Sequence, residues 1–316
     1  MIDFQNVSKS YGGPTLAIDN VSLNIARGEF VVLIGASGSG KSTLLKMINR
    51  MESHDAGNVR VDGRDINTLP LRELRLRMGY AIQSVGLFPH WTVARNIGTV
   101  PALLGWPVEK ISKRVDTLLQ LFDLDPAEYR GRYPQQLSGG QQQRVGVARA
   151  LAADPDVLLM DEPFGALDPV IRASLQREMK RIHLQSRKTI VMVTHDIDEA
   201  LFLATRIVLL DHGRVLQAAT PLELLTRPAS EAVIDFIGRS ELGLKRLSLM
   251  PARDLARQEA LQPGAALLAD ISVREALSFM ALHGVSFVNL TGAAGEHVGV
   301  LHAADIFCST AVEAQS

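Results

Sequence analysis

Short apolar runs alternate with longer amphipathic segments through the first 235 residues. Four runs are rich in β-branched residues and leucine and lack strict alternation, namely 30–35, 156–161, 189–194 and 206–211. Strands of this kind are buried on both faces of a sheet. The segment 174–186, in contrast, places Leu175, Met179 and Ile182 on one helical face. Strands that alternate with helices predict an α/β layer built on a parallel sheet.

The composition of the chain changes after about residue 236. Residues 247–316 carry three Arg and no Lys against three Asp and four Glu, so this segment is acidic. It still contains helix and strand patterns, which indicates a small folded module. We therefore predict a first domain at 1–238, a linker at 239–250 and a second domain at 251–316.

Composition and charge narrow the class of protein. The chain has 33 Lys+Arg against 34 Asp+Glu, and this balance argues against a nucleic-acid-binding protein. An apolar content of 47% excludes disorder over most of the chain. The single cysteine, Cys308, cannot form a disulfide within the chain and favours a reducing compartment. We see neither a secretory signal nor an apolar stretch of about 18 residues, so other chains must supply any membrane part.

A glycine-rich loop follows the first of the buried runs. Residues 35–43 read GASGSGKST, which matches the phosphate-binding loop of P-loop NTPases. The glycines let the backbone curl so that its amides face phosphate oxygens, and the next helix adds its positive end. We expect Lys41 to neutralise the β- and γ-phosphates of ATP and Ser42 to bind Mg²⁺. The candidate ATP-binding residues are Gly35, Ala36, Ser37, Gly38, Ser39, Gly40, Lys41, Ser42 and Thr43.

Two carboxylates follow the buried run that ends at Met160. Ligands bind at the carboxyl ends of strands in α/β sheets, so this pair is expected beside the phosphate loop. Asp161 would support Mg²⁺, and Glu162 would polarise the water that attacks the γ-phosphate. The pair alone could be an ordinary strand-end turn, and the upstream phosphate loop makes hydrolysis the better interpretation.

The segment LSGGQ, continued by QQRVGVARAL to residue 151, is the most specific pattern in the chain. It resembles the signature of the ATP-binding-cassette (ABC) family. The resemblance implies a RecA-like P-loop core with a helical subdomain. It also implies a cassette homodimer, in which amides at a helix start bind the γ-phosphate held by the other cassette. The signature residues are Leu137, Ser138, Gly139, Gly140 and Gln141.

Four further positions match the family one by one. Tyr11 corresponds to the aromatic ring that stacks on adenine, and Gln83 to the glutamine that contacts Mg²⁺ and the attacking water. Asp168 corresponds to the acidic residue of the loop that crosses the dimer interface. His195 corresponds to the histidine that contacts the γ-phosphate. The resemblance thus implies three catalytic residues, Glu162, His195 and Gln83, and three metal-binding residues, Ser42, Gln83 and Asp161.

The cassette is most similar to the ATP-binding subunits of osmoprotectant importers, which carry glycine betaine, choline, proline betaine or carnitine. The segments that carry this resemblance are 46–59, 86–97 and 160–172. The second contains a Phe-Pro-His-Trp cluster that is expected to contact a partner or to form a local core. The resemblance implies an ATP hydrolase coupled to transport, bound peripherally to the cytoplasmic face of the membrane. Its implied partners are two membrane-spanning permease subunits and, indirectly, an extracytoplasmic substrate-binding protein.

Residues 271–307 resemble one cystathionine-β-synthase (CBS) repeat. The matching features are a helix from Val273, a turn at Gly284, a strand, and a glycine turn near 292–295. Such repeats usually occur in pairs that bind adenine nucleotides, and this chain has one. We expect a small α+β module that is either half of a nucleotide site or purely structural.

Two alternatives stay open at this point. The first is an importer of another substrate, such as an amino acid, with the same fold and chemistry. The second is a soluble ABC ATPase of DNA repair or translation. Lys41 and Ser138 are only 97 residues apart and LSGGQ occurs once, which argues against the long insertion or tandem cassettes of those proteins.

Overall fold

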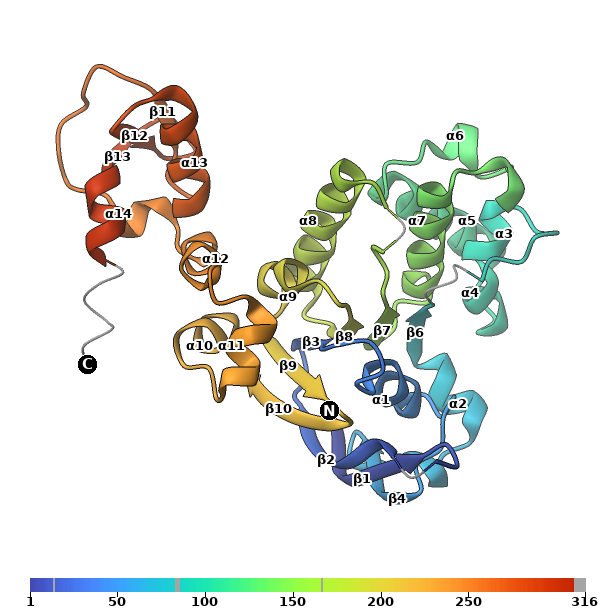
Figure 1. Cartoon of the computed structure of the whole chain (residues 1–316). Coiled ribbons are helices and arrows are strands. Elements are labelled where there is room, and N and C mark those ends of the chain that lie inside the picture. Colours follow the sequence, from blue (N-terminus) through green and yellow to red (C-terminus); the bar gives the residue numbers. More distant parts are fainter. Residues whose placement is uncertain (14, 83–85, 166, 310–316) are drawn as a thin grey trace. The chain divides into compact units, whose positions relative to one another are not determined.

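The chain divides into two compact units, Met1–Thr220 and Pro221–Ser316. The computed structural model describes residues 1–13, 15–82, 86–165 and 167–309 (Figure 1). The division lies 18 residues before the expected boundary at 238. Part of the expected linker, 239–250, is a helix that buries Lys245 and Leu247, and Leu247 belongs to the core of the second unit. This segment is therefore part of a folded unit.

The first unit is built on a six-stranded sheet with the order β10-β9-β3-β8-β7-β6. All neighbouring pairs are parallel except β9 and β10. Every residue of β3, β7 and β8 is buried, as expected for central strands covered on both faces. The predicted α/β class is thus confirmed. The strands are β3 (Phe30–Ile34), β6 (Met78–Ala81), β7 (Val157–Asp161), β8 (Thr189–Val193), β9 (Arg206–Asp211) and β10 (Arg214–Ala219).

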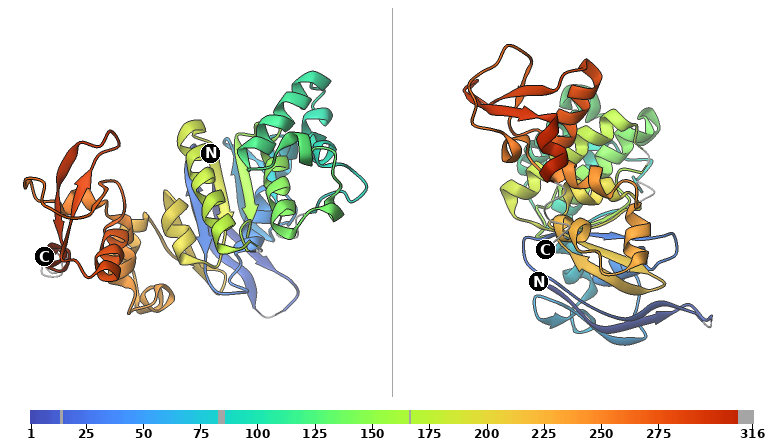
Figure 2. Two further views of the ribbon diagram at one scale, coloured as in Figure 1. Left: turned by 90° about the horizontal axis from the view of Figure 1, so that it is seen from above. Right: turned by 60° about the vertical axis from the view of Figure 1, so that its left-hand side comes forward.

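A second, antiparallel sheet lies on the other side of helix α1 (Lys41–Ile48). Its order is β2-β1-β4-β5. Apolar side chains of α1 share one core with residues of both sheets, so this helix is packed between them (Figures 1 and 2). The strands are β1 (Ile2–Ser10), β2 (Leu16–Ile25), β4 (Ala56–Val61) and β5 (Arg64–Asp65).

The helices α8 (Pro169–Ser186) and α9 (Ile197–Leu203) cover the opposite face of the parallel sheet (Figures 1 and 2). The predicted apolar face of α8 is buried at Leu175 and Met179, whereas Ile182 is half-buried. The next residue, His183, is buried, and its Nε2 atom lies 2.9 Å from the carbonyl oxygen of Gly28. The buried face of α8 therefore ends at His183 and not at the predicted Ile182.

A group of helices between β4 and β7 forms the rest of the first unit. It includes the predicted helical subdomain, and α7 packs against both β6 and the short helix α3 (Figure 1). The elements are η1 (Ile66–Thr68), α2 (Leu71–Leu76), α3 (Val93–Ile97), α4 (Thr99–Leu103), α5 (Val108–Leu121), α6 (Pro126–Tyr129), η2 (Pro134–Gln136) and α7 (Gly139–Leu151).

The second unit has a three-stranded sheet with the order β11-β12-β13. The predicted helix begins at Val273, with Ser272 and Glu275 forming a capping box, and it ends at His283, where Gly284 caps it. Gly284 has φ 65°, which glycine adopts at little cost. The elements are α10 (Pro221–Thr226), α11 (Glu231–Ile237), α12 (Leu242–Leu249), η3 (Ala252–Leu255), β11 (Ala266–Leu268), α13 (Val273–His283), β12 (Phe287–Thr291), β13 (His297–His302) and α14 (Ala303–Ser309).

Within the described ranges of both units, no helix combines the length and apolar character needed to cross a membrane.

Candidate functional site

The phosphate loop connects the end of β3 to the start of α1. Two of its glycines are required by close backbone contacts. A Cβ atom at Gly35, where φ is 148°, would lie 2.1 Å from the carbonyl oxygen of Leu210. A Cβ atom at Gly40, where φ is 99°, would lie 2.6 Å from the carbonyl oxygen of Ala17. The loop is therefore held tightly between β2 and the end of β9.

Lys41 is buried at the start of α1, inside the curve of the loop. Its Nζ atom donates to the carbonyl oxygens of Gly35 at 2.8 Å and Ala36 at 2.7 Å. Burial lowers the pKa of Lys41, whereas the carboxylates of Glu162 and Asp161 act in the opposite direction. A cation held here, beside a turn of backbone amides, suits a polyphosphate.

Ser42 and Asp161 meet between α1 and the end of β7. The Ser42 hydroxyl donates to Asp161 Oδ1 at 2.9 Å, and Asp161 is buried. Hydroxyl and carboxylate oxygens are the ligands that Mg²⁺ prefers, so the pair fits this ion. In the described part of the chain, no group of three or more His, Cys, Asp or Glu side chains could hold a metal.

Glu162 and His195 come from adjacent strands, β7 and β8. Glu162 Oε1 lies 3.6 Å from His195 Nδ1. The backbone amide of Glu162 donates to the carbonyl oxygen of Val193 at 3.0 Å. Its φ of 45° is uncommon for a residue other than glycine and is often found at functional sites. The sheet therefore brings together Lys41, Ser42, Asp161, Glu162 and His195, as the sequence predicts.

A buried carboxyl group behind His195 was not expected from the sequence. Glu199 Oε2 accepts a hydrogen bond of 2.6 Å from the hydroxyl of Thr194, the residue before His195. Glu199 Oε1 accepts another, of 3.1 Å, from Gln176 on α8. Burial raises the pKa of Glu199. A glutamate in the first turn of a helix gives little sign of burial, and only the position of Thr194 before His195 could have drawn attention to it.

Tyr11 and Gln83 complete the residues expected around ATP. The Tyr11 ring is 60% exposed, and its hydroxyl lies 3.4 Å from the Thr43 hydroxyl in α1. The ring is thus available for stacking beside the end of the phosphate loop. Gln83 lies outside the described residues, so its role stays a prediction.

The signature residues form the start of α7. The Ser138 side chain accepts a hydrogen bond from the Gln141 amide, and the Gln141 side chain accepts one from the Ser138 amide. Ser138 and Gly139 are exposed, so the positive end of the helix faces outwards. Within the described chain, no hydrogen bond joins the signature 137–141 to the phosphate loop 35–43.

Asp168 has a clear local role. Its Oδ1 atom accepts hydrogen bonds of 3.1 Å from the amides of Val170 and Ile171, so it caps the start of α8. The preceding Ala166 lies outside the described residues. The expected position of Asp168 at a dimer interface stays a prediction.

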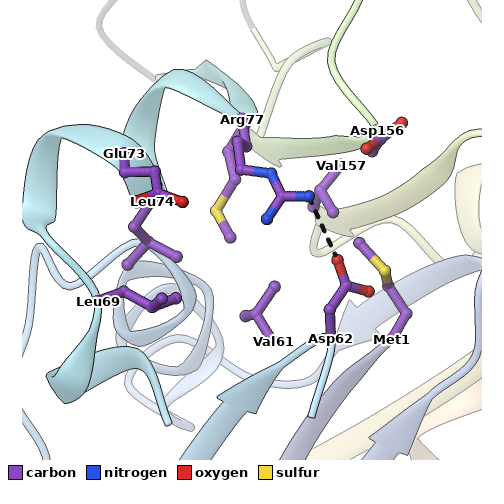
Figure 3. Close-up of a pocket in the computed structure, with 10 residues that line it drawn as sticks. Met1, Val61, Asp62, Leu69, Glu73, Leu74, Arg77, Asp156 and Val157 are labelled. Atoms are coloured by element: carbon purple, nitrogen blue, oxygen red, sulfur yellow. Dashed lines mark ion pairs between the residues drawn. The ribbon is translucent and has the colours of Figure 1, made fainter. Parts of the chain in front are cut away.

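A small, partly open cavity lies far from these residues along the sheet (Figure 3). Its lining includes Met78 and Val157 at the starts of β6 and β7, whereas Asp161 is at the end of β7. Figure 3 shows Arg77 pointing toward Asp62, at 3.9 Å. The volume, about 20 Å³, has room for about one water molecule. This cavity is too small for a nucleotide and is unrelated to the phosphate loop.

The Phe-Pro-His-Trp cluster forms an exposed loop before α3. The rings of Phe88 and Trp91 are 4.4 Å apart, and the Arg95 guanidinium lies 4.2 Å from the Trp91 ring. Asn96, which is fully buried, holds the loop by four hydrogen bonds. Its Oδ1 accepts from the Phe88 amide, and its Nδ2 donates to three backbone carbonyl oxygens, of Phe88, Trp91 and Thr92. The aromatic cluster is thus presented on a fixed loop.

We expect Asn96→Ala to lower the free energy of unfolding by about 2–4 kcal/mol, because four hydrogen bonds are lost and a buried site is left empty. Thermal unfolding of the whole chain measures the effect. Asn67→Ala, which removes an exposed asparagine side chain, is the matched control. Equal melting temperatures for the two variants would contradict this role of Asn96.

Comparison with known proteins agrees with this geometry. Residues 18–165 match the model of the ABC transporter family. The glycine betaine uptake system ATP-binding protein YehX of Escherichia coli (strain K12) is 56% identical over 306 residues, which is 97% of this chain and 99% of YehX. The choline transport ATP-binding protein OpuBA of Bacillus subtilis (strain 168) is 49% identical over 89% of this chain and 72% of OpuBA.

A solved structure is similar to the first unit. The ATP-binding cassette MJ0796, in a dimeric post-hydrolysis state bound to ADP and phosphate, superposes with a TM-score of 0.65 at 36% identity. The match covers 70% of this chain and 99% of that one. Together with the near full-length match to YehX, it confirms the fold and the family that the motifs indicated. The chain belongs to the ABC transporter family, as one of its ATP-binding ATPases.

Proposed function

We propose that this chain is the ATPase subunit of an importer for glycine betaine, choline and related quaternary amines. One observation carries the proposal. A phosphate loop with a buried lysine, a Ser–Asp pair and a Glu–His pair share one sheet edge, in a chain 56% identical to a glycine betaine uptake ATPase over nearly its whole length.

In this proposal ATP lies along the phosphate loop. Lys41 and the loop amides bind the β- and γ-phosphates, and the Tyr11 ring stacks on adenine. Ser42 and Asp161 hold Mg²⁺, which supplies charge neutralisation at the phosphates when bound. Glu162 orients and deprotonates the attacking water, and His195 contacts the γ-phosphate. Two contacts support the assignment. Ser42 at the start of α1 lies 2.9 Å from Asp161 at the end of β7, and Glu162 lies 3.6 Å from His195, which follows the adjacent strand β8.

The outward-facing start of α7 supports a second cassette as the partner of this site. In a homodimer, the amides of the signature helix would bind the γ-phosphate held by the other chain. Gln83 and Asp168 would complete the site at that interface. Two membrane permease subunits would dock on the cassettes, with the aromatic loop at Phe88 and Trp91 as one contact. The chain would then lie on the cytoplasmic face of the membrane, and a substrate-binding protein would act outside.

The share of this chain that each relative covers favours a quaternary amine as the substrate. The glycine betaine relative YehX and the osmoprotectant import protein OsmV of Salmonella typhimurium match 97% and 95% of this chain. A sulfate/thiosulfate import ATPase of Nocardia farcinica matches 75%, at 44% identity. The similarity to YehX and OsmV thus extends through the second unit, beyond the shared cassette.

The second unit supports the proposed likeness to one CBS repeat. Its helix α13, its strands β12 and β13 and the final helix α14 follow one another as that repeat requires. We propose that this unit is a regulatory or dimerising module.

The proposal is tested by uptake of labelled glycine betaine in cells that lack other betaine uptake systems. The cells carry the native permease and substrate-binding protein, together with this chain or its Lys41→Ala variant. We expect uptake only with the unaltered chain. Measurements at high and at low salt then show whether uptake responds to osmotic conditions. If the purified complex hydrolyses ATP and neither chain supports uptake, the ATPase assignment stands and the substrate class is wrong.

A further inference from the structure

The turn between β9 and β10 contacts the phosphate loop directly. The amide of Gly213, in this turn, donates to the carbonyl oxygen of Ser39 in the loop at 3.2 Å. The carbonyl oxygen of Gly213 accepts a hydrogen bond of 2.9 Å from the amide of Asp19 in β2. Gly213 thus bridges the phosphate loop and β2 with both of its backbone groups.

There is no room for a side chain at Gly213. A Cβ atom there would lie 2.8 Å from the carbonyl oxygen of Ala17 and 3.2 Å from the Cα atom of Ile18. These same residues confine the loop at Gly40, whose Cβ would meet Ala17 and Ile18 at 2.6 Å. Any shift of β2 away from the turn would therefore also loosen the packing around Gly40.

The hydrogen bond to Ser39 has a consequence for the phosphate-binding amides. The peptide between Ser39 and Gly40 is planar, and in a trans peptide the carbonyl and the amide point in opposite directions. When Gly213 fixes the Ser39 carbonyl oxygen, it also fixes the direction of the Gly40 amide at the start of α1. Amides at this position are the ones that face a phosphate.

We propose that Gly213 is a positioning residue for ATP binding. It holds the Ser39–Gly40 peptide in the orientation that presents the Gly40 amide to a phosphate. The inference rests on the proposed binding of ATP at residues 35–43. It adds a residue that lies 170 positions away in sequence and outside the motifs of the cassette.

The chain offers a matched control for this role. Gly63 lies in the turn between β4 and β5 with φ 76°, and Gly213 has φ 77°. The preceding residues, Asp62 and His212, have φ 51° and 45°, so the two turns have similar backbones. A Cβ atom at Gly63 would meet no atom within 4 Å. Alanine therefore adds similar backbone strain at both sites, and only Gly213→Ala disturbs the contact with β2 and the loop.

The test compares Gly213→Ala with Gly63→Ala in the full chain. We expect Gly213→Ala to raise the KM for ATP about ten- to hundredfold, because misdirecting the Gly40 amide removes a hydrogen bond to a charged phosphate, and such a bond contributes about this much to affinity. The kcat at saturating ATP should fall much less. Gly63→Ala should leave both constants unchanged. Equal KM values for the two variants, or a loss confined to kcat, would overturn the proposal.

A second measurement needs no substitution. In the unaltered chain, ATP should slow amide hydrogen exchange at Gly213 by ordering the loop, while exchange at Gly63 stays constant. If ATP binds and exchange at Gly213 does not change, the positioning role is wrong and the ATP site stands. If ATP does not bind to the unaltered chain at all, the proposed function itself fails, so the two failures are distinguishable.

Discussion

Lys41→Ala is expected to weaken ATP binding about ten- to hundredfold. The variant removes a buried ammonium that faces the inside of the phosphate loop. A hydrogen bond to a charged group contributes about 1.5–3 kcal/mol, and about 1.4 kcal/mol corresponds to a tenfold change in affinity. Equilibrium titration with ATP measures the loss, and the hydrolysis rate at low ATP should fall with it.

Lys46→Ala is the control for this variant. Lys46 lies in the last turn of the same helix and is not among the residues assigned to ATP. The Lys46→Ala variant should retain full affinity for ATP. Because Lys41 also bonds to the loop carbonyls, thermal unfolding of both variants separates a loss of binding from a loss of fold. Unchanged affinity in a folded Lys41→Ala variant would exclude residues 35–43 as the ATP site.

Glu162→Gln is expected to slow ATP hydrolysis about 10²- to 10⁴-fold while ATP still binds, because the amide cannot accept a proton from water. Glutamine has almost the same shape, so the contact with His195 and the backbone bond to Val193 can persist. The bound ATP should then accumulate and hold two cassettes together. Single-turnover hydrolysis and a sizing column run with ATP measure the two effects.

Glu178→Gln provides the comparison on the surface of the same unit. Glu178 pairs with Arg181 on α8, away from the phosphate loop, and its replacement should leave hydrolysis unchanged. A Glu162→Gln variant that hydrolyses ATP at the normal rate would remove Glu162 from the mechanism. One that stays monomeric with ATP would indicate that the permease subunits are needed for dimerisation.

The core of the fold and most of the site were predictable from the sequence for a physical reason. Central parallel strands are apolar along their whole length, so β3, β7, β8 and β9 stand out as uninterrupted runs. Polar residues at the ends of such strands must meet at one edge of the sheet. This rule accounts for Asp161 and Glu162 at the end of β7, whereas Lys41 was expected from the phosphate-loop motif and His195 from the family resemblance.

Other features depend on contacts that a sequence pattern does not specify. The helices α10, α11 and α12 are amphipathic, and periodicity does not say which of two cores they cover. The boundary was therefore expected at 238 and lies at 220. Glu199 was missed because glutamates early in a helix are usually exposed. The contact between Gly213 and the phosphate loop joins segments that are distant in the chain, so no local sequence pattern indicates it.

The positive φ angle of Glu162 implies that stability and activity make opposite demands at this position. A side chain held at φ 45° costs of order 1 kcal/mol relative to glycine or asparagine, which adopt this conformation more readily. Replacing Glu162 by either residue would relieve that strain and at the same time remove the carboxylate assigned to catalysis. Selection for heat resistance alone would therefore enrich variants that bind ATP and do not hydrolyse it. The glutamate in this chain therefore carries a cost in stability together with its assigned role in turnover.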